Sequence, residues 1–340
     1  MEIEYTVTRL KALAGRFPSY GEFIRILQME DARGVAGLLE GSVFAPEMES
    51  LVAKGETDIS PMRLLRVMAD GHHRLRRHFA GMAMQTDPRS CRAILMRWEI
   101  EELKSALRYL KYHGEKVERR FGFNSLILPE GKTPLWEAKD RSLAHFIAAL
   151  AQARHPLAPA VDREEYLKDT VKAELGIERY FYGEWLPSQK GIAAQAAESL
   201  ADRLDAANIA AAMLIREAKS GRGEASSYYV AGCGEVMVDD FMTIVEGPAW
   251  APFQIVKKKM GLSPRKGSEI SATIFALEIK RALARRYKLA CMLDPVGMRD
   301  FVWFMEELDI TVSNLKLAVN HALTHTPAGE AADIFIKVTI

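Results

Sequence analysis

Histidines are the residues whose types and spacing best suit metal binding. His321 and His325 are four residues apart, so they share one face wherever a helix carries both. A second group comprises His72, His73 and His78. A zinc site takes three or four ligands, no Glu-x-x-His element accompanies the first pair, and a Thr-Pro step directly after it ends the helix. The second group lies among arginines, whose charge opposes a metal ion. We therefore predict no metal site and no cofactor.

Nucleotide binding and nucleophilic catalysis lack their usual residues. The nearest glycine cluster, 221–223, follows a predicted helix, whereas a phosphate-binding loop precedes one. Cys91, Cys233 and Cys291 are too scattered for a disulfide framework or a cysteine-rich metal site. Cys233 lies between two glycines without a nearby histidine, which is typical of a turn. The sequence thus predicts a protein that is not itself an enzyme.

A cationic stretch between residues 63 and 77 carries two interpretations. Its arginines, offset only by Asp70, are Arg63, Arg66, Arg74, Arg76 and Arg77. In the first interpretation, Arg74, Arg76 and Arg77 dock an acidic partner or anionic lipid headgroups, each adding about 1 kcal/mol near a membrane surface. In the second, which we favour, the stretch is a solvated helical face with internal ion pairs.

A second basic zone, 257–259 and 280–288, interleaves Phe275 and Tyr287 with cations, a pattern also seen in RNA contacts. The whole chain argues against this, because 46 Lys+Arg against 45 Asp+Glu leave a net charge of only +1. We predict no nucleic-acid partner.

The elements that carry these residues are predicted to be helices. The 340 residues are 49% apolar and 27% charged, rich in Ala, Leu, Glu, Lys, Arg and Met, and nearly free of alternating Val/Ile/Thr. The exceptions are 226–230 and 334–340, each a frayed end or a small strand. The longest stretch without Asp, Glu, Lys or Arg has 13 residues, fewer than the roughly 20 of a membrane span. The sequence therefore predicts an all-α protein that reaches a membrane only peripherally.

An internal repeat relates three of the predicted helices. In the first copy the apolar residues recur every three or four positions: Met96, Ile100, Leu103, Leu107 and Leu110. The same stripe, weaker in the second copy, returns 106 and 212 residues later, centred on Ile209 and Leu315. Three helical units of about 100 residues follow from this spacing.

A polar residue precedes the central apolar residue of each copy: Glu102, Asn208 and Asn314. These three side chains have two interpretations. They line a central socket and meet a partner, or they cap or cross-link helices where the repeats join. We favour the second, because satisfied buried polar groups rigidify a core.

These helices resemble a known family. The segments 97–108 (RWEIEELKSALR), 203–209 (RLDAANI) and 307–316 (ELDITVSNLK) are similar to the signature helices of the C-type central-stalk component of V/A-type ATPases, which corresponds to the d-type component of eukaryotic vacuolar ATPases. The aromatic cluster 180–182 also matches the family's style. The first copy departs from the pattern, with Glu99 for Asp and Glu102 for Asn.

The resemblance implies three pseudo-threefold-related helical bundles forming a funnel-like body with a central cavity. The expected repeats are 1–115, 116–222 and 223–340. It also implies a peripheral rotor part on the cytoplasmic face of a membrane, between a proteolipid ring and the central-stalk subunits of the catalytic head. Such a part serves proton or sodium transport without doing chemistry. The alternative is a free-standing helical-repeat scaffold that binds another protein.

Overall fold

The computed structural model describes residues 3–29, 31–52, 59–113, 125–128, 142–219, 222–264, 271–293, 297–324 and 335–336. Within these ranges every regular element is helical and no strand occurs, which confirms the all-α prediction. Of the two predicted exceptions, the first is helical at its start, since the 3₁₀ helix η4 covers Arg222–Tyr228. Most of the second, 334–340, lies outside the described residues, as does His325.

The chain divides into two compact units. The first is discontinuous and comprises Met1–Thr86 with Leu277–Ile340. The second is the continuous segment Asp87–Ala276 between them. The division into three repeats and the funnel around a cavity stay predictions.

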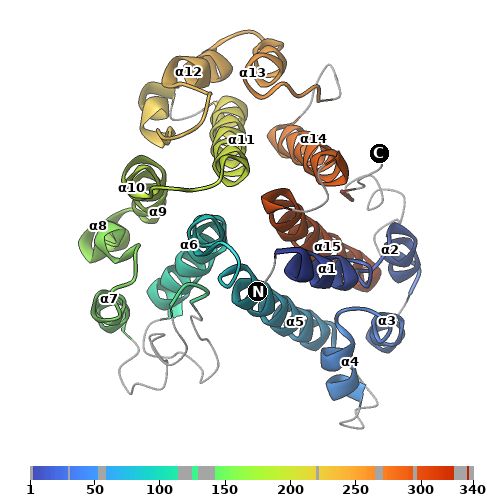
Figure 1. Cartoon of the computed structure of the whole chain (residues 1–340). Helices are drawn as coiled ribbons and strands as arrows, with labels where there is room; N and C mark the ends of the chain where they lie inside the picture. Colours follow the sequence, from blue (N-terminus) through green and yellow to red (C-terminus); the bar gives the residue numbers. More distant parts are fainter. Residues whose placement is uncertain are drawn as a thin grey trace. The chain divides into compact units, whose positions relative to one another are not determined.

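The first unit gathers helices from both ends of the chain around one long helix (Figure 1). Its central helix, α15 (Met298–Thr324), packs chiefly against three elements from the other end of the chain: α1 (Ile3–Ala14), α2 (Tyr20–Leu27) and α5 (Pro61–Ala83). The short helices α3 (Ala32–Leu39) and α4 (Ala45–Val52) pack beside α5. Helix α14 (Ala272–Leu293) begins in the second unit and ends in this one.

Aromatic side chains fill the core of the first unit. Phe79 of α5 stacks on Phe304 of α15, with 5.2 Å between ring centroids, and meets Phe301 edge-on at 5.9 Å. Phe17, between α1 and α2, adds a further contact to Phe304 at 5.6 Å. Each ring buries a large apolar area, so the pairing of α5 with α15 holds distant parts of the sequence together.

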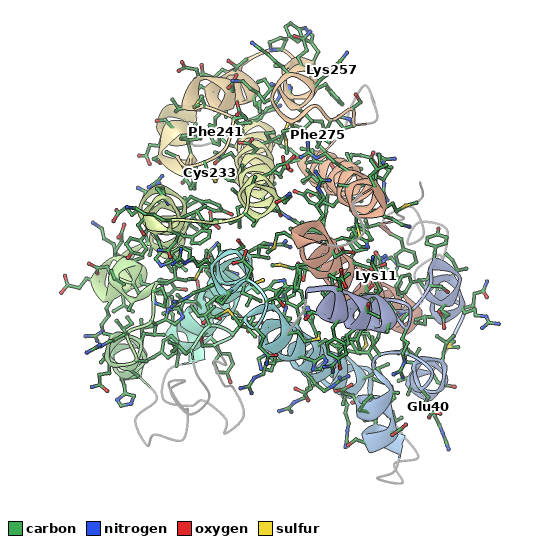
Figure 2. The ribbon with its side chains drawn as sticks, viewed as in Figure 1. Lys11, Glu40, Cys233, Phe241, Lys257 and Phe275 are labelled. Atoms are coloured by element: carbon green, nitrogen blue, oxygen red, sulfur yellow. The ribbon has the colours of Figure 1, made fainter. Side chains whose placement is uncertain are left out.

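The second unit is built from the middle of the chain. Its helices are α6 (Pro88–His113), α7 (Leu143–Gln152), α8 (Arg163–Lys168), α9 (Thr170–Tyr180), α10 (Leu186–Ser188), α11 (Ala194–Ala218), α12 (Val238–Glu246) and α13 (Ala251–Met260), with the short η2 (Ala158–Ala160), η3 (Phe181–Trp185) and η4. Helix α11 packs against α6, α12 and α13. Phe241 of α12 and Phe275 at the start of α14, both labelled in Figure 2, are fully buried.

Local sequence signals explain where several helices begin and end. Ser19 and Glu22 form a reciprocal capping box that starts α2, and Asp169 accepts two backbone N–H groups at the start of α9. Gly261, with φ of 63°, ends α13 in the left-handed conformation that glycine adopts without strain. Such boundaries fix where each helix begins or ends along the chain.

Candidate functional site

The second and third signature helices each hold a returning backbone segment through one buried asparagine. Asn208 of α11 donates from Nδ2 to the Val230 carbonyl at 2.9 Å, and its Oδ1 accepts the Val230 N–H at 3.0 Å. Asn314 of α15 makes the same pair of bonds with Ile336, at 3.1 and 3.0 Å. We call this arrangement the amide clamp. Each clamp joins residues 22 apart in sequence, and the two clamps are 106 positions apart, which is the spacing of the sequence repeat.

Burial makes each amide clamp important for stability. Asn208 and Asn314 are only 2% and 3% exposed, and the backbone groups that they satisfy belong to buried residues. A peptide N–H and a carbonyl that lose their partners in such a place each cost about 1–3 kcal/mol. An asparagine side chain suits the task because it carries a donor and an acceptor in one plane.

On the second signature helix, an acidic residue three positions before the clamp asparagine also holds the returning segment. Asp205 of α11 accepts the N–H groups of Glu235 and Val236, both at 2.9 Å, and burial raises the pKa of its carboxyl. The loop between Val230 and Glu235 packs closely against Tyr182. A Cβ added to Gly232 of this loop would lie only 2.7 Å from the Cβ of Tyr182, so only glycine fits there. Exposed Cys233 lies in this loop, as the turn interpretation predicts.

The first copy replaces Asp by Glu99 and uses it differently. Glu99 and His155 are both fully buried, with Oε1 and Nε2 2.7 Å apart, while Oε2 accepts the Leu126 N–H at 2.8 Å. His155 Nδ1 accepts the Leu157 N–H at 3.2 Å, so the ring proton lies on Nε2 and is donated to Glu99. Sequence analysis missed His155, because it stands alone shortly after α7 and no motif around it indicates that it pairs with Glu99. Glu99, at the aligned position of Asp205, was detectable from the repeat.

Two further ion pairs that sequence analysis missed join α6 to α9. Lys104 pairs with Glu178, and Arg108 holds Glu174 through Nε at 2.6 Å. Lys104 is 7% exposed, and its partners' charges raise its pKa although burial alone lowers it. Lys104 and Arg108 directly follow Leu103 and Leu107 of the predicted apolar stripe, so they lie on the face of α6 beside that stripe. Glu102 itself is half-buried on α6.

The cationic stretch on α5 makes internal ion pairs. Arg74 donates to both carboxylate oxygens of Glu47, at 2.5 and 3.0 Å, and to the Val43 carbonyl at 2.6 Å. Arg76, 11% exposed, lies 3.5 Å from Asp309 of α15. Arg77 is the exposed member of the three. The internal pairing of Arg74 and Arg76 favours the second interpretation for these two residues.

Two groups of the first unit titrate far from their ordinary pKa values. Burial lowers the pKa of His72 from 6.5 to about 4, against an opposing interaction with Asp309, whose Oδ1 lies 3.7 Å from Nε2. Burial raises the pKa of Glu307 from 4.5 to about 7, against the opposing charge of Lys288 and a hydrogen bond from Trp303. At neutral pH His72 is uncharged, and Glu307 is divided between its two forms.

No group of three or more His, Cys, Asp or Glu residues in the described part of the chain is placed to hold a metal ion. Likewise, none of the helices over the described ranges is long and apolar enough to cross a membrane. The histidine pair at the end of α15, for which the sequence analysis predicts no metal, is described only at its first member, His321.

Fold and site together define an all-helical protein whose long helices hold returning segments by buried side-chain-to-backbone bonds. Residues 6–320 match the model of the ATP synthase (C/AC39) subunit family, and the chain belongs to this family. The resemblance found in the signature helices is thereby confirmed. Family membership implies a non-catalytic stalk subunit of a V/A-type ATPase, associated with other subunits of that complex. A search of curated proteins found no match.

We predict that removing either amide clamp destabilises the protein. Asn208→Ala and Asn314→Ala each leave a buried N–H and a buried carbonyl without partners, so we expect each to lower the free energy of unfolding by about 3 kcal/mol. Urea denaturation followed by circular dichroism measures this. The control is Ser313→Ala on exposed α15 surface, expected to stay within about 0.5 kcal/mol. Asparagine variants as stable as this control would contradict the clamp's role.

We predict opposite pH dependences for two variants of the first unit. His72 binds its proton more weakly when folded, so its contribution to stability is present above pH 6.5 and is lost as pH falls toward 4. Glu307 binds its proton more tightly when folded, so its contribution is present below pH 4.5 and is lost as pH rises toward 7. In the native protein, the two groups therefore change the free energy of unfolding with pH in opposite directions.

Replacing one of these groups leaves the pH dependence of the unfolding free energy that the other group causes. From about pH 7 to about pH 5, we expect His72→Gln to gain about 2 kcal/mol of unfolding free energy relative to wild type, and Glu307→Gln to lose about 2 kcal/mol. Denaturation at both pH values measures this, and the basal cost of each substitution cancels in the difference. Slopes equal to that of wild type would show that neither group titrates as described.

Proposed function

We propose that this chain caps the proteolipid ring of a V/A-type ATPase on its cytoplasmic face and couples the ring to the rotating stalk. Rotation driven by ATP hydrolysis in the catalytic head passes through the chain to the ring during pumping, and in the reverse direction during synthesis. The observation that carries this proposal is the family match over residues 6–320. The transported ion, H⁺ or Na⁺, is determined in the ring.

Torque transmission needs a body that resists internal deformation, and two features support this. Close-packed interiors are poorly compressible, and each unit has such an interior, with Trp98, Phe241 and Phe301 at most 1% exposed. The amide clamps add directional bonds that shear of a helix past its returning segment would break. A twisting load therefore acts against several buried hydrogen bonds at once.

An exposed surface of mixed character on α14 supports a role in partner binding. Its last turn exposes Leu289, Met292 and Leu293 by 46%, 62% and 76%. Three exposed apolar side chains this close together are expensive in water and favour a protein or membrane partner. Positively charged Arg285 and Lys288 precede them on the same helix.

The six predicted contact residues take different parts in this proposal. Asn208 and Asn314 position the returning segments, and Arg74 and Arg76 join helices of the first unit. We propose Arg77 as the residue of this group that meets the ring or its lipid headgroups, and Glu102 as a contact to the stalk.

We predict that the tagged chain, recovered from gently solubilised membranes of its own host, copurifies with proteolipid, stalk and catalytic-head subunits in a constant ratio. Mass spectrometry with subunit quantification measures this. Recovery of the chain alone, from cells that express a V/A-type ATPase, would overturn the rotor proposal and favour the free-standing scaffold.

We predict that Arg77→Glu weakens association with the isolated proteolipid ring about tenfold at low salt, since it reverses one charge near an anionic surface. Cosedimentation with ring-containing liposomes measures this. Lys168→Glu, which changes an exposed cation on α8, is the matched control. Association that is equal in both variants removes Arg77 from the contact surface.

A further inference from the structure

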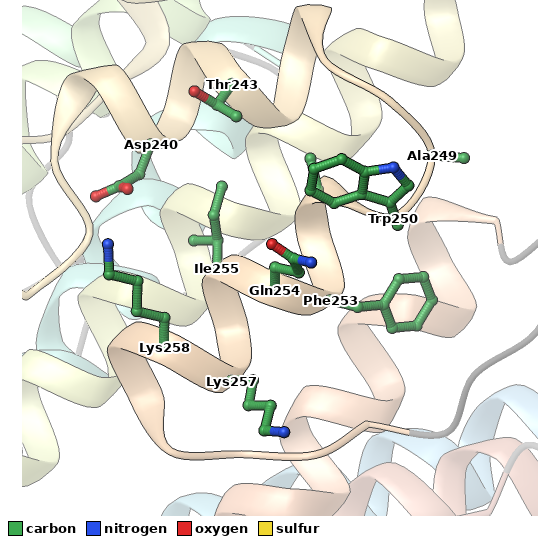
Figure 3. Close-up of a pocket in the computed structure, with 10 residues that line it drawn as sticks. Asp240, Thr243, Ala249, Trp250, Phe253, Gln254, Ile255, Lys257 and Lys258 are labelled. Carbon is green, nitrogen blue, oxygen red and sulfur yellow. The ribbon is translucent and has the colours of Figure 1, made fainter.

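A wide groove lies between α12 and α13 in the second unit (Figure 3). Its volume is about 940 Å³, which falls within the range of sites that take a ligand or a partner's side chains. Asp240 and Thr243 come from α12, and the other wall follows α13 from Trp250 to Lys258. Because all of these residues belong to one compact unit, the groove is complete within that unit.

One end of the groove is apolar and exposed. Trp250, at the start of α13, is 57% exposed, and Phe253, three residues further along, also lines the groove (Figure 3). Phe253 in turn packs edge-on against buried Phe275 at 5.0 Å, which fixes its orientation. Tryptophan is enriched among the residues that anchor protein interfaces, so an exposed tryptophan on the wall of a groove suits this role.

The other end of the groove is positively charged. Lys257 and Lys258 are exposed in the last turns of α13. The acid across the groove, Asp240, is paired with Lys259 at 3.1 Å, so its charge is already compensated. Lysines near a helix C-terminus interact favourably with the helix dipole. That interaction accounts for the presence of lysines, but the exposed tryptophan at the opposite end has no such explanation.

Helix geometry gives the distance between the two ends. Trp250 and Lys257 are seven residues apart on α13, which corresponds to about 10 Å at 1.5 Å per residue. A partner helix lying along the groove therefore presents an apolar side chain and a carboxylate about two turns apart on one face.

We propose that this groove is a docking site for an acidic amphipathic helix of a partner protein. The partner's apolar side chain packs on Trp250 and Phe253, and its carboxylates, seven and eight residues away, pair with Lys257 and Lys258. The inference goes beyond the proposed function, because it concerns a further contact surface and holds whether or not the chain caps a ring.

The test uses the full chain and a designed, fluorescently labelled helical peptide of about 18 residues. The peptide carries leucines at one end of a face and glutamates seven and eight positions away. Fluorescence anisotropy measures its binding at about 50 mM and about 300 mM NaCl. We expect binding that weakens at the higher salt, and binding at least tenfold weaker for a peptide with lysine in place of each glutamate.

Variants at the two ends of the groove separate the apolar contribution to peptide binding from the electrostatic one. Trp250→Ala, and Lys257→Glu combined with Lys258→Glu, should each weaken binding of the acidic peptide at least tenfold. The matched controls lie on α8: Leu167→Ala removes an apolar side chain of 48% exposure, and Lys168→Glu reverses an exposed cation. Both controls should bind the peptide like wild type.

Three results would overturn the proposal. The first is no binding by wild type, or binding by the groove variants within twofold of wild type. The second is a concentration-dependent dimer in light scattering that Trp250→Ala abolishes, which assigns the groove to a second copy. The third is binding of anionic vesicles through Lys257 and Lys258 without binding of the peptide, which assigns it to a lipid surface.

Discussion

The amide clamp is the interaction on which much of this structure depends. A long helix cannot by itself satisfy the backbone of an irregular segment that returns along its side. Asn208 and Asn314 solve this problem with one side chain each, by giving a donor and an acceptor to a single buried residue. Because the bonds are directional, they also fix the register between the helix and the returning segment.

Residue composition predicted the helical class, the resemblance of the signature helices indicated the family, and the internal repeat singled out Asn208 and Asn314 as polar residues of interest. The repeat was informative because two physical requirements recur every 106 residues: an apolar stripe, and a polar residue beside its centre. The periodic stripe also placed α6, α11 and α15 correctly. What a stripe cannot encode is the partner of each polar residue. Val230 and Ile336 are apolar residues that contribute only their backbones, so no residue type marks them in the sequence.

The remaining site residues show the same limit. Arg74 and Arg76 look like a surface patch in sequence, yet they pair with Glu47 and Asp309, which lie far away along the chain. Buried Glu99 finds His155 across 56 residues. The shifted pKa values of His72 and Glu307 depend on burial that no local pattern reveals. The family match supplies the biological setting for a body of this kind, a non-catalytic stalk subunit of a V/A-type ATPase.

The discontinuous first unit has a consequence for the order of events during synthesis. Helices α1, α2 and α5 leave the ribosome first, but the helix on which all three pack, α15, is made last. The second unit, encoded between them, is complete before α15 exists. Since domains form as units while the chain emerges, the middle of this protein can fold first. Its beginning must wait for its end, with Phe17 and Phe79 exposed to any chaperone that protects nascent apolar segments.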